Sequence, residues 1–245
     1  MPSRRNFLRR VGATAAVGSV ATTAGCLNGG FVRTKLGGGS TDTVDLSSPD
    51  DDVFVPPDRF DAYRNRMRAE YGAAAIPWSD PDSLPVRFLG ARARRMEITP
   101  SRRLAVQDAA LLVHRLADER YRLRLWSAGR LLGKRYEVDP WGYYTEEPAF
   151  TWLEQEIEAE ADDHLSAGRS LSTDGGRVRA AGGAVTVPDG SYESNVERET
   201  YRSRWEGFHP GVVPLVGACE LSFVDPSERR FTWSLSNGVG IRTPY

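Results

Sequence analysis

The three histidines are the first candidates for acid–base chemistry or metal binding, but their spacing favours neither. His114, His164 and His209 lie far apart in the sequence, so no two share the short spacing typical of zinc or copper ligands. The fold could still bring them together. His164 follows Glu160 at helical spacing beside two aspartates, which would offer a cation several oxygens, although a solvated acidic helix end explains the same residues. We predict no metal site and no cofactor.

Motifs for a nucleophile or a bound nucleotide do not occur in the chain. There is no Gly-x-Ser-x-Gly elbow, no phosphate-binding loop and no dinucleotide fingerprint, although glycine is plentiful. Cys219 lies in an alternating apolar segment, so we expect a buried thiol with a raised pKa rather than a nucleophile. Catalytic residues therefore stay unassigned, although an Asp/Glu pair can act without a local motif.

A dense group of aromatic residues is the one feature that suggests ligand binding. The group runs from Tyr136 to Trp152 and has Glu146 and Glu147 between its members. Exposed aromatic rings beside carboxylates can stack on sugars or bind cations. The alternative is that the rings close the hydrophobic core between a hairpin and a helix. The candidate ligand-stacking residues are Trp141, Tyr143, Tyr144 and Trp152.

The N-terminus has the pattern of an export signal. Ser3-Arg4-Arg5-Asn6-Phe7-Leu8-Arg9 resembles the twin-arginine consensus, in which two arginines precede Phe, Leu and a basic residue. Residues 11–25 form an uncharged run of 15 residues, which is shorter than the roughly 20 that a membrane span requires and typical of a signal peptide. The resemblance implies export through the twin-arginine (Tat) translocase. The residues that it assigns to the export signal are Arg4, Arg5, Phe7 and Leu8.

The uncharged run closes on Thr23-Ala24-Gly25-Cys26, which resembles a lipobox with Thr23 where Leu is usual. Small residues fit the processing enzyme, and the thiol of the following cysteine accepts the lipid. The resemblance implies that Cys26 anchors the mature protein to membrane lipid on the extracytoplasmic face of the cell membrane. The alternative is an ordinary export signal cleaved elsewhere. Since Cys219 is the only other cysteine, lipidation of Cys26 would leave no disulfide partner.

The charge balance argues against a nucleic-acid partner. The signal holds four of the 32 basic residues, so its removal leaves 28 against 33 acidic residues, a net charge of about −5. Strong nucleic-acid binding needs a basic surface. Only Lys35 and Lys134 are lysines, and the composition resembles that of secreted proteins of salt-loving archaea, in which molar salt shortens the Debye length to about 3 Å. A GC-rich genome explains the arginine bias equally well.

Apolar residues recur every three to four positions in three segments, which predicts three helices. The first covers residues 58–71 and ends at Gly72. The second begins at Thr99-Pro100, a capping residue and a first-turn proline, and ends near residue 118. The third covers residues 148–165 and exposes a series of glutamates. The side chains that we expect these helices to bury are Phe60, Tyr63, Met67 and Tyr71, then Val106, Ala109, Ala110, Val113, Leu116 and Ala117, then Phe150, Leu153, Ile157 and Ala161.

Alternation of apolar and polar residues predicts strands between the helices. We expect a short strand at residues 94–98. A hairpin joins residues 121–125 to 131–138 through a turn at 127–129, with helix continuation as the alternative. A second, small hairpin pairs residues 177–181 with 184–187. The spacing of apolar residues over 191–205 does not distinguish a helix from a strand.

The C-terminal segment shows the clearest alternation. Apolar residues share one face over residues 213–223 and again over 231–235. Turn sequences at Asp225-Pro226-Ser227 and Asn237-Gly238 would connect these strands into an antiparallel meander.

These elements predict an α+β fold with two or three helices packed on an antiparallel β-sheet that ends in a C-terminal β-meander. We expect a removed signal peptide at 1–25, the lipidated cysteine and a flexible tether at 26–56, and a single globular domain at 57–245. The favoured function is a non-catalytic extracytoplasmic binding or accessory lipoprotein whose ligand is unassigned. The alternative is a cell-surface hydrolase that uses an Asp/Glu pair.

Overall fold

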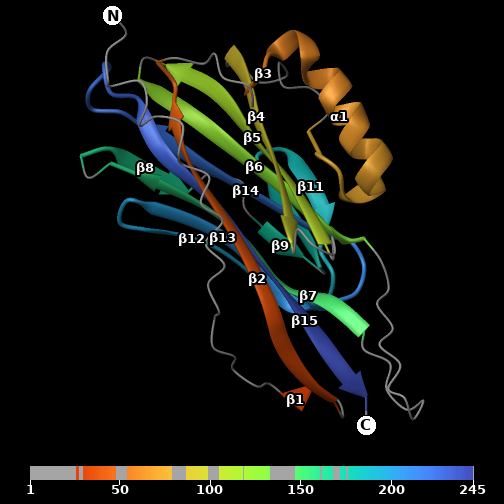
Figure 1. Ribbon diagram of the computed structural model, residues 1–245. Coiled ribbons are helices and arrows are strands. Elements are labelled where there is room, and N and C mark those ends of the chain that lie inside the picture. The colour runs from red at the N-terminus through yellow and green to blue at the C-terminus, as the bar shows by residue number, and fades with distance from the viewer. Residues whose placement is uncertain are drawn as a thin grey trace, which may run out of the picture.

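A computed structural model describes residues 26–27, 30–47, 54–78, 87–98, 105–117, 119–132, 147–160, 162–167, 172–174 and 176–244. Within this part of the chain there are three antiparallel sheets and a single α-helix (Figure 1). The α+β prediction is therefore wrong, because the protein is nearly all β.

Two six-stranded sheets make up most of the molecule, and a three-stranded sheet is attached to them. Sheet A contains, in spatial order, β1 (Cys26–Leu27), β2 (Gly30–Asp45), β15 (Arg230–Pro244), β7 (Glu147–Ala159), β13 (Thr200–His209) and β12 (Gly190–Glu197). Sheet B contains β3 (Phe54–Val55), β4 (Arg87–Ile98), β5 (Ala105–Ala117), β6 (Arg120–Leu131), β14 (Val213–Ser222) and β8 (His164–Ala167). Sheet C contains β11 (Gly183–Thr186), β10 (Arg177–Ala180) and β9 (Ser172–Asp174).

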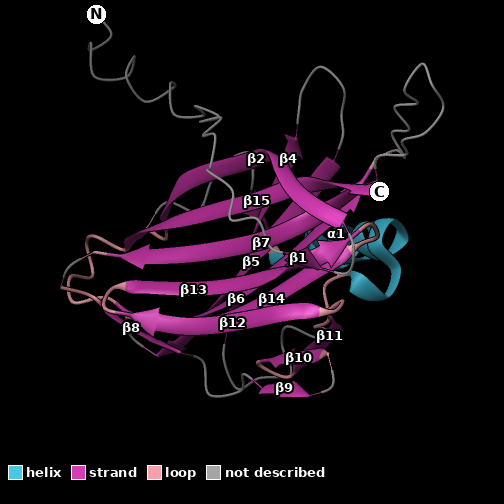
Figure 2. Ribbon diagram, turned by 90° about the horizontal axis from the view of Figure 1, so that it is seen from below, coloured by secondary structure: helices cyan, strands magenta, loops and turns pink. Residues whose placement is uncertain are grey.

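Sheets A and B stack face to face and enclose a hydrophobic core (Figure 2). Alternate side chains of β5, β6 and β14 point into this core from one side, and those of β7, β13 and β15 from the other. The largest contributors include Leu111, Leu125, Tyr201, Phe231 and Trp233. Polar contacts also join the two sheets: the Asn237 side-chain amide donates to Gln107 Oε1 at 2.6 Å, and the Ala218 backbone N–H donates to the Tyr201 hydroxyl at 3.0 Å.

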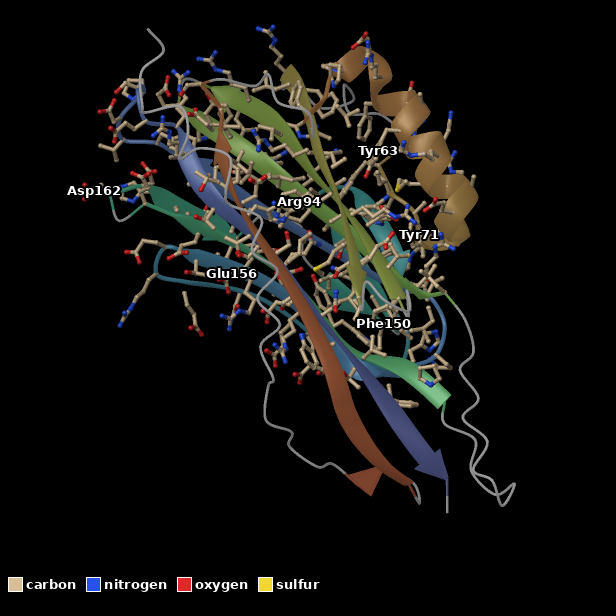
Figure 3. The ribbon with its side chains drawn as sticks, viewed as in Figure 1. Tyr63, Tyr71, Arg94, Phe150, Glu156 and Asp162 are labelled. Atoms are coloured by element: carbon tan, nitrogen blue, oxygen red, sulfur yellow. The ribbon has the colours of Figure 1, made fainter. Side chains whose placement is uncertain are left out.

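The second face of sheet B is covered by α1 (Pro57–Tyr71), by the 3-10 turn η3 (Gly72–Ala74) and by sheet C. The predicted first helix is confirmed: α1 buries Phe60, Tyr63, Met67 and Tyr71, and Gly72 ends it with a positive φ of 56°. Tyr63 and Tyr71 lie between the helix and the sheet (Figure 3). The Tyr71 ring meets the Trp126 ring at 5.6 Å between centroids. Burial of these four large side chains is what holds α1 on the sheet.

The predicted second helix is wrong, because residues 105–117 form β5. This strand is covered on both faces, so Ala109 and Leu111 point toward sheet A while Ala110 and Leu112 point toward α1. A strand buried on both sides has a continuous apolar sequence rather than an alternating one. In the Ala- and Leu-rich sequence here, such a run is indistinguishable from a helical stripe.

The predicted third helix is also wrong, because residues 147–159 form β7 and residues 164–167 form β8. A register shift between Gly238 and Val239 of β15 places Trp152 and Phe150 opposite consecutive residues, so that Thr151 is an extra residue in β7. Phe150, Leu153 and Ile157 therefore all face the interior although they are three and four positions apart. The bulge produces the spacing that we interpreted as helical.

Three further expectations need correction. Gly30–Asp45, predicted to belong to a flexible tether, is the strand β2, which pairs with β15 along its length. Residues 127–129 do not form a turn but lie inside β6, where Phe150 packs against Gly129. The C-terminal meander is not formed either, because β14 belongs to sheet B and β15 to sheet A, and Asn237-Gly238 lies within β15. Neighbouring strands in sequence often pair, but here the chain crosses the sandwich.

The remaining strand predictions agree with the structure. Residues 94–98 belong to β4, and the small hairpin is formed by β10 and β11, with Arg177 opposite Thr186. The ambiguous residues 191–205 fall in the hairpin of β12 and β13.

Candidate binding surface

The outer face of sheet A carries an ordered array of polar side chains. Inward residues of β7 such as Leu153 and Ile157 fill the core, so Glu154, Glu156 and Glu158 point outward because side chains alternate along a strand. The sequence predicted that these glutamates are exposed. They do point outward, but from a strand rather than from a helix, and their arginine partners leave only 17% of the Glu154 side chain and 27% of the Glu156 side chain exposed.

Arginines on the neighbouring strand β13 stand opposite these glutamates. Arg202 pairs in register with Glu156 and donates from Nη2 to Glu156 Oε2 at 2.9 Å, while Arg204 Nη1 donates to Glu154 Oε2 at 2.8 Å. Arg204 also contacts Glu206. The hydrogen bond with Glu156 raises the pKa of Arg202. Arg202 is half exposed, so its ion pair with Glu156 contributes little to stability. A ligand can therefore replace either partner of this pair.

Hydroxyl groups line the opposite side of the glutamate row. Thr232, Ser234 and Ser236 of β15 face outward, and the Ser236 hydroxyl donates to Glu154 Oε1 at 3.2 Å. Thr41 Oγ1 and Ser234 Oγ are 3.1 Å apart and join β2 to β15. The outer face of sheet A therefore presents rows of hydroxyl groups, carboxylates and guanidinium groups.

Trp152 places a large aromatic ring on this face. Its indole lies over Gly238 of β15 and touches Gly37 of β2, where a Cβ would be 3.6 Å from the ring. A Cβ at Gly238 would overlap the ring, so only glycine leaves room for it. The Arg204 guanidinium carbon is 5.9 Å from the ring centroid. Trp152 is thus a half-buried platform with charged groups at its edge.

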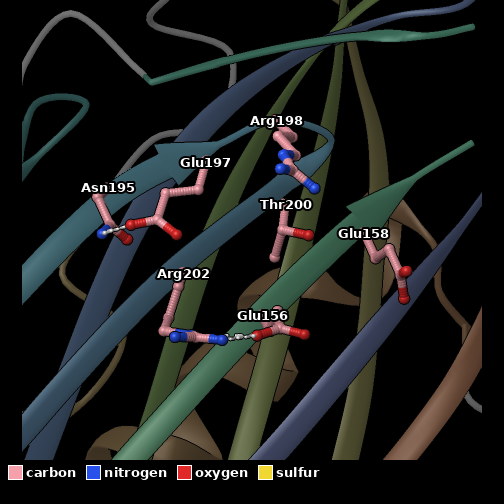
Figure 4. A pocket seen from close by; sticks show the side chains of 7 residues that line it. All are labelled: Glu156, Glu158, Asn195, Glu197, Arg198, Thr200 and Arg202. Carbon is pink, nitrogen blue, oxygen red and sulfur yellow. Dashed lines mark hydrogen bonds and ion pairs between the residues drawn. The ribbon is translucent and has the colours of Figure 1, made fainter. Parts of the chain in front are cut away.

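A shallow hollow lies at the far end of the same face (Figure 4). It has a volume of about 340 Å³ and is formed by the ends of β7, β12 and β13 with the turn at Arg198. Small-molecule sites are mostly apolar and enclosed. This hollow is polar and open, so it fits an extension of a binding surface better than a pocket for a small ligand. The lining residues are Glu156, Glu158, Asn195, Glu197, Arg198, Thr200 and Arg202.

The structure separates the aromatic candidates. Phe150 is fully buried between the sheets, whereas Trp152 lies on the outer face of sheet A. The other predicted stacking residues, Trp141, Tyr143 and Tyr144, lie outside the described residues. The export-signal residues Arg4, Arg5, Phe7 and Leu8 lie outside them as well.

Cysteine and histidine positions support no catalytic centre among the described residues. Cys26 belongs to β1, opposite Phe31 of β2. Cys219 is buried in β14, and burial raises the pKa of its thiol, as predicted. His114, His164 and His209 lie on three different strands, and no group of three or more His, Cys, Asp or Glu side chains in the described ranges is arranged to hold a metal ion. None of the described helices is long and apolar enough to span a membrane.

One pair of carboxyl groups lies close together, where α1 meets sheet B. Asp108 accepts a hydrogen bond from the Tyr71 hydroxyl at 2.6 Å, and Arg95 Nη1 is 3.5 Å from both Asp108 Oδ2 and Glu70 Oε2. Burial and the neighbouring Glu70 raise the pKa of Asp108, although Tyr71 and Arg95 oppose the shift. Asp108 is almost fully buried and its contacts are to α1 and β4, so this network attaches the helix to the sheet.

Comparison with known proteins assigns this chain to no family. No family model, curated protein or solved structure matches this chain. The candidate surface therefore rests on its own geometry.

Most of this surface is not predictable from the helical spacing of its apolar residues. The arginines of β13 alternate with buried Tyr201, Ser203 and Trp205, and this period of two would have indicated a strand with an exposed charged face. The role of Gly238 had no local signal, because it depends on a ring from a strand that is distant in sequence.

Proposed function

We propose that this protein is a lipid-anchored extracytoplasmic binding protein whose ligand-binding surface is the outer face of sheet A. The anchor and the export route rest on the resemblance of residues 1–26 to a twin-arginine lipoprotein signal. The binding function rests on Trp152, which is held flat over Gly238 on a polar surface.

The chemistry around Trp152 favours a glycan as the ligand class. The C–H face of a sugar ring stacks on an indole, and its hydroxyl groups exchange hydrogen bonds with carboxylates and guanidinium groups. Arg204 and Glu206 stand beside the ring, and the hydroxyl-bearing strand β15 lies on its other side. Both kinds of group are thus within one sugar unit of the platform.

The shape and charge of the face narrow the ligand further. An open sheet face with a shallow hollow suits an extended polymer better than a single sugar. Six carboxylates face outward from β7, β12 and β13 around three arginines, so a polyanion is disfavoured. A neutral polysaccharide fits the surface best. These six carboxylates and three arginines are Glu154, Glu156, Glu158, Glu193, Glu197, Glu206, Arg198, Arg202 and Arg204.

Affinity electrophoresis tests this function directly. The full chain is run in native gels that contain hydroxyethylcellulose, barley β-glucan or galactomannan, and at least one of these polymers should retard it. Trp152→Ala should weaken the affinity about tenfold or more, because it removes the stacking platform. Val224→Ala, a truncation of an exposed apolar side chain in the loop between β14 and β15 and outside the strands of sheet A, is the matched control and should be retarded like the unmodified chain. Equal migration of the unmodified chain in all gels, or equal retardation of Trp152→Ala, would contradict the proposal.

A further inference from the structure

Arg124 is a buried cation on the face of sheet B that α1 and sheet C cover. It lies in the middle of β6, and only 3% of its surface is exposed. Its register neighbours are Leu112 of β5 and Ala218 of β14, which are both apolar and buried. Neither register neighbour therefore provides a countercharge.

Trp78 covers the guanidinium group. The Arg124 Cζ atom is 5.4 Å from the centroid of the indole ring. The ring is fixed from the other side, because Trp78 Nε1 donates to the Ala180 carbonyl of β10 at 3.0 Å. Gly183 of β11 leaves room for it, since a Cβ there would lie 2.6 Å from Trp78 Nε1. Arg124 thus lies beneath a rigid aromatic cover at the junction of sheet C and the segment that follows α1.

No carboxylate neutralises Arg124 within the described part of the chain. Its Nε atom is buried without a hydrogen-bond partner. The carboxylate of Glu220, on the adjacent strand, is 2.6 Å from Nη2 of Arg122 and is already paired. Burial and the like charge of Arg122 lower the pKa of Arg124 to about 10. A buried charge without a partner is strongly unfavourable, and buried charges in proteins are therefore paired or bind ions.

We infer that Arg124 is the receptor for a small oxyanion that binds beneath Trp78. A guanidinium group presents a planar fork of N–H donors that matches a carboxylate, a phosphate or a sulfate. The indole face would exclude water from the pair and strengthen it. This site lies on sheet B and is independent of the glycan surface on sheet A.

Thermal unfolding of the full chain tests the inference. Sodium acetate, phosphate and sulfate at millimolar concentration are compared with sodium chloride at equal ionic strength, and the acetate arm separates planar from tetrahedral ligands. At about one hundred times its Kd, the bound oxyanion should raise Tm by roughly 5 to 10 °C. Arg124→Met should abolish this response, and its Tm without oxyanion should equal or exceed that of the unmodified chain, because an unpaired buried charge is removed.

Two variants keep the test decisive. Arg59→Met removes an exposed arginine of α1, outside both proposed sites, and should keep the full response. Arg124→Lys retains the charge but loses the fork, and should weaken the oxyanion affinity about tenfold. If the unmodified chain responds to none of the three oxyanions, or if Arg124→Lys and Arg124→Met respond as it does, the inference is overturned.

Discussion

Asp108 shows how one buried carboxyl group links this fold to pH. Its pKa is raised mainly by burial, with Glu70 adding to the shift, although Tyr71 and Arg95 partly oppose it. The native state therefore holds the Asp108 proton more tightly than the unfolded chain does. By linkage, the contribution to stability is fully present below the unfolded pKa and is lost as pH rises through the native pKa.

We predict that Asp108→Asn removes the loss of stability that Asp108 causes as pH rises. As pH rises above about 4, the free energy of unfolding of the variant should increase relative to that of the unmodified chain. Asparagine keeps an acceptor for the Tyr71 hydroxyl, so α1 should stay attached. Urea unfolding at a series of pH values measures the difference.

Asp225→Asn is the control of opposite sign. Hydrogen bonds from Ser227 lower the pKa of Asp225, so its contribution is present above the unfolded pKa and is lost as pH falls through the native pKa. Parallel pH profiles for all three proteins would show that the Asp108 shift has no effect on stability.

At the scale of elements, the outer face of sheet A depends on a match between two distant strands. β7 supplies the ring of Trp152, and β15 supplies the glycine beneath it. The bulge at Thr151 adds one residue to β7 and so shifts the alternation of its side chains. Trp152 therefore points outward, while Phe150 and Leu153 both lie in the core. The platform is therefore a product of strand pairing rather than of either strand alone.

We predict that Gly238→Ala destabilises the protein by about 1 to 3 kcal/mol, because its methyl group would overlap the Trp152 ring. Gly39→Ala is the matched control, since a Cβ there meets only the Leu235 carbonyl at 3.6 Å, an ordinary contact. Urea unfolding measures both. In a double-mutant cycle, Trp152→Ala should rescue most of the loss caused by Gly238→Ala. Additive effects would show that the ring does not lie over Gly238.

At the scale of the whole molecule, the position of Cys26 changes how an anchor would hold the protein. Cys26 belongs to β1, which pairs with the first residues of the long strand β2 (Figure 1). A lipid on Cys26 would therefore sit at the end of the β2–β15 ribbon rather than beyond a long flexible tether. Ordered strands would then separate the two-sheet core from the membrane.

We predict that Cys26→Ser either releases the mature protein into the medium or leaves an unprocessed precursor, because serine cannot accept the thioether lipid. Cell fractionation with immunoblotting gives both location and size. Cys219→Ala should stay on the membrane, since that thiol is buried in β14. Membrane association and size that are unchanged in Cys26→Ser would exclude the anchor.

Local patterns predicted only part of this architecture. The helix over residues 58–71 was predictable because one of its faces meets the protein and the other meets water, so its period is visible in the sequence. The same holds for the β10–β11 hairpin, whose turn is local, and for the outward-facing row from Glu154 to Glu158. Ala109 and Leu112 carried no such signal, because both faces of β5 are buried.

By itself, the sequence determined where surface and core residues lie along each alternating segment, and its residues 1–26 resemble a twin-arginine lipoprotein signal. Only the tertiary structure decided that β14 and β15 belong to different sheets, that Trp152 lies on glycine, and that Arg124 is buried beneath Trp78. The physical reason is that strand pairing joins segments far apart in the chain, so no local pattern records which partner a residue meets.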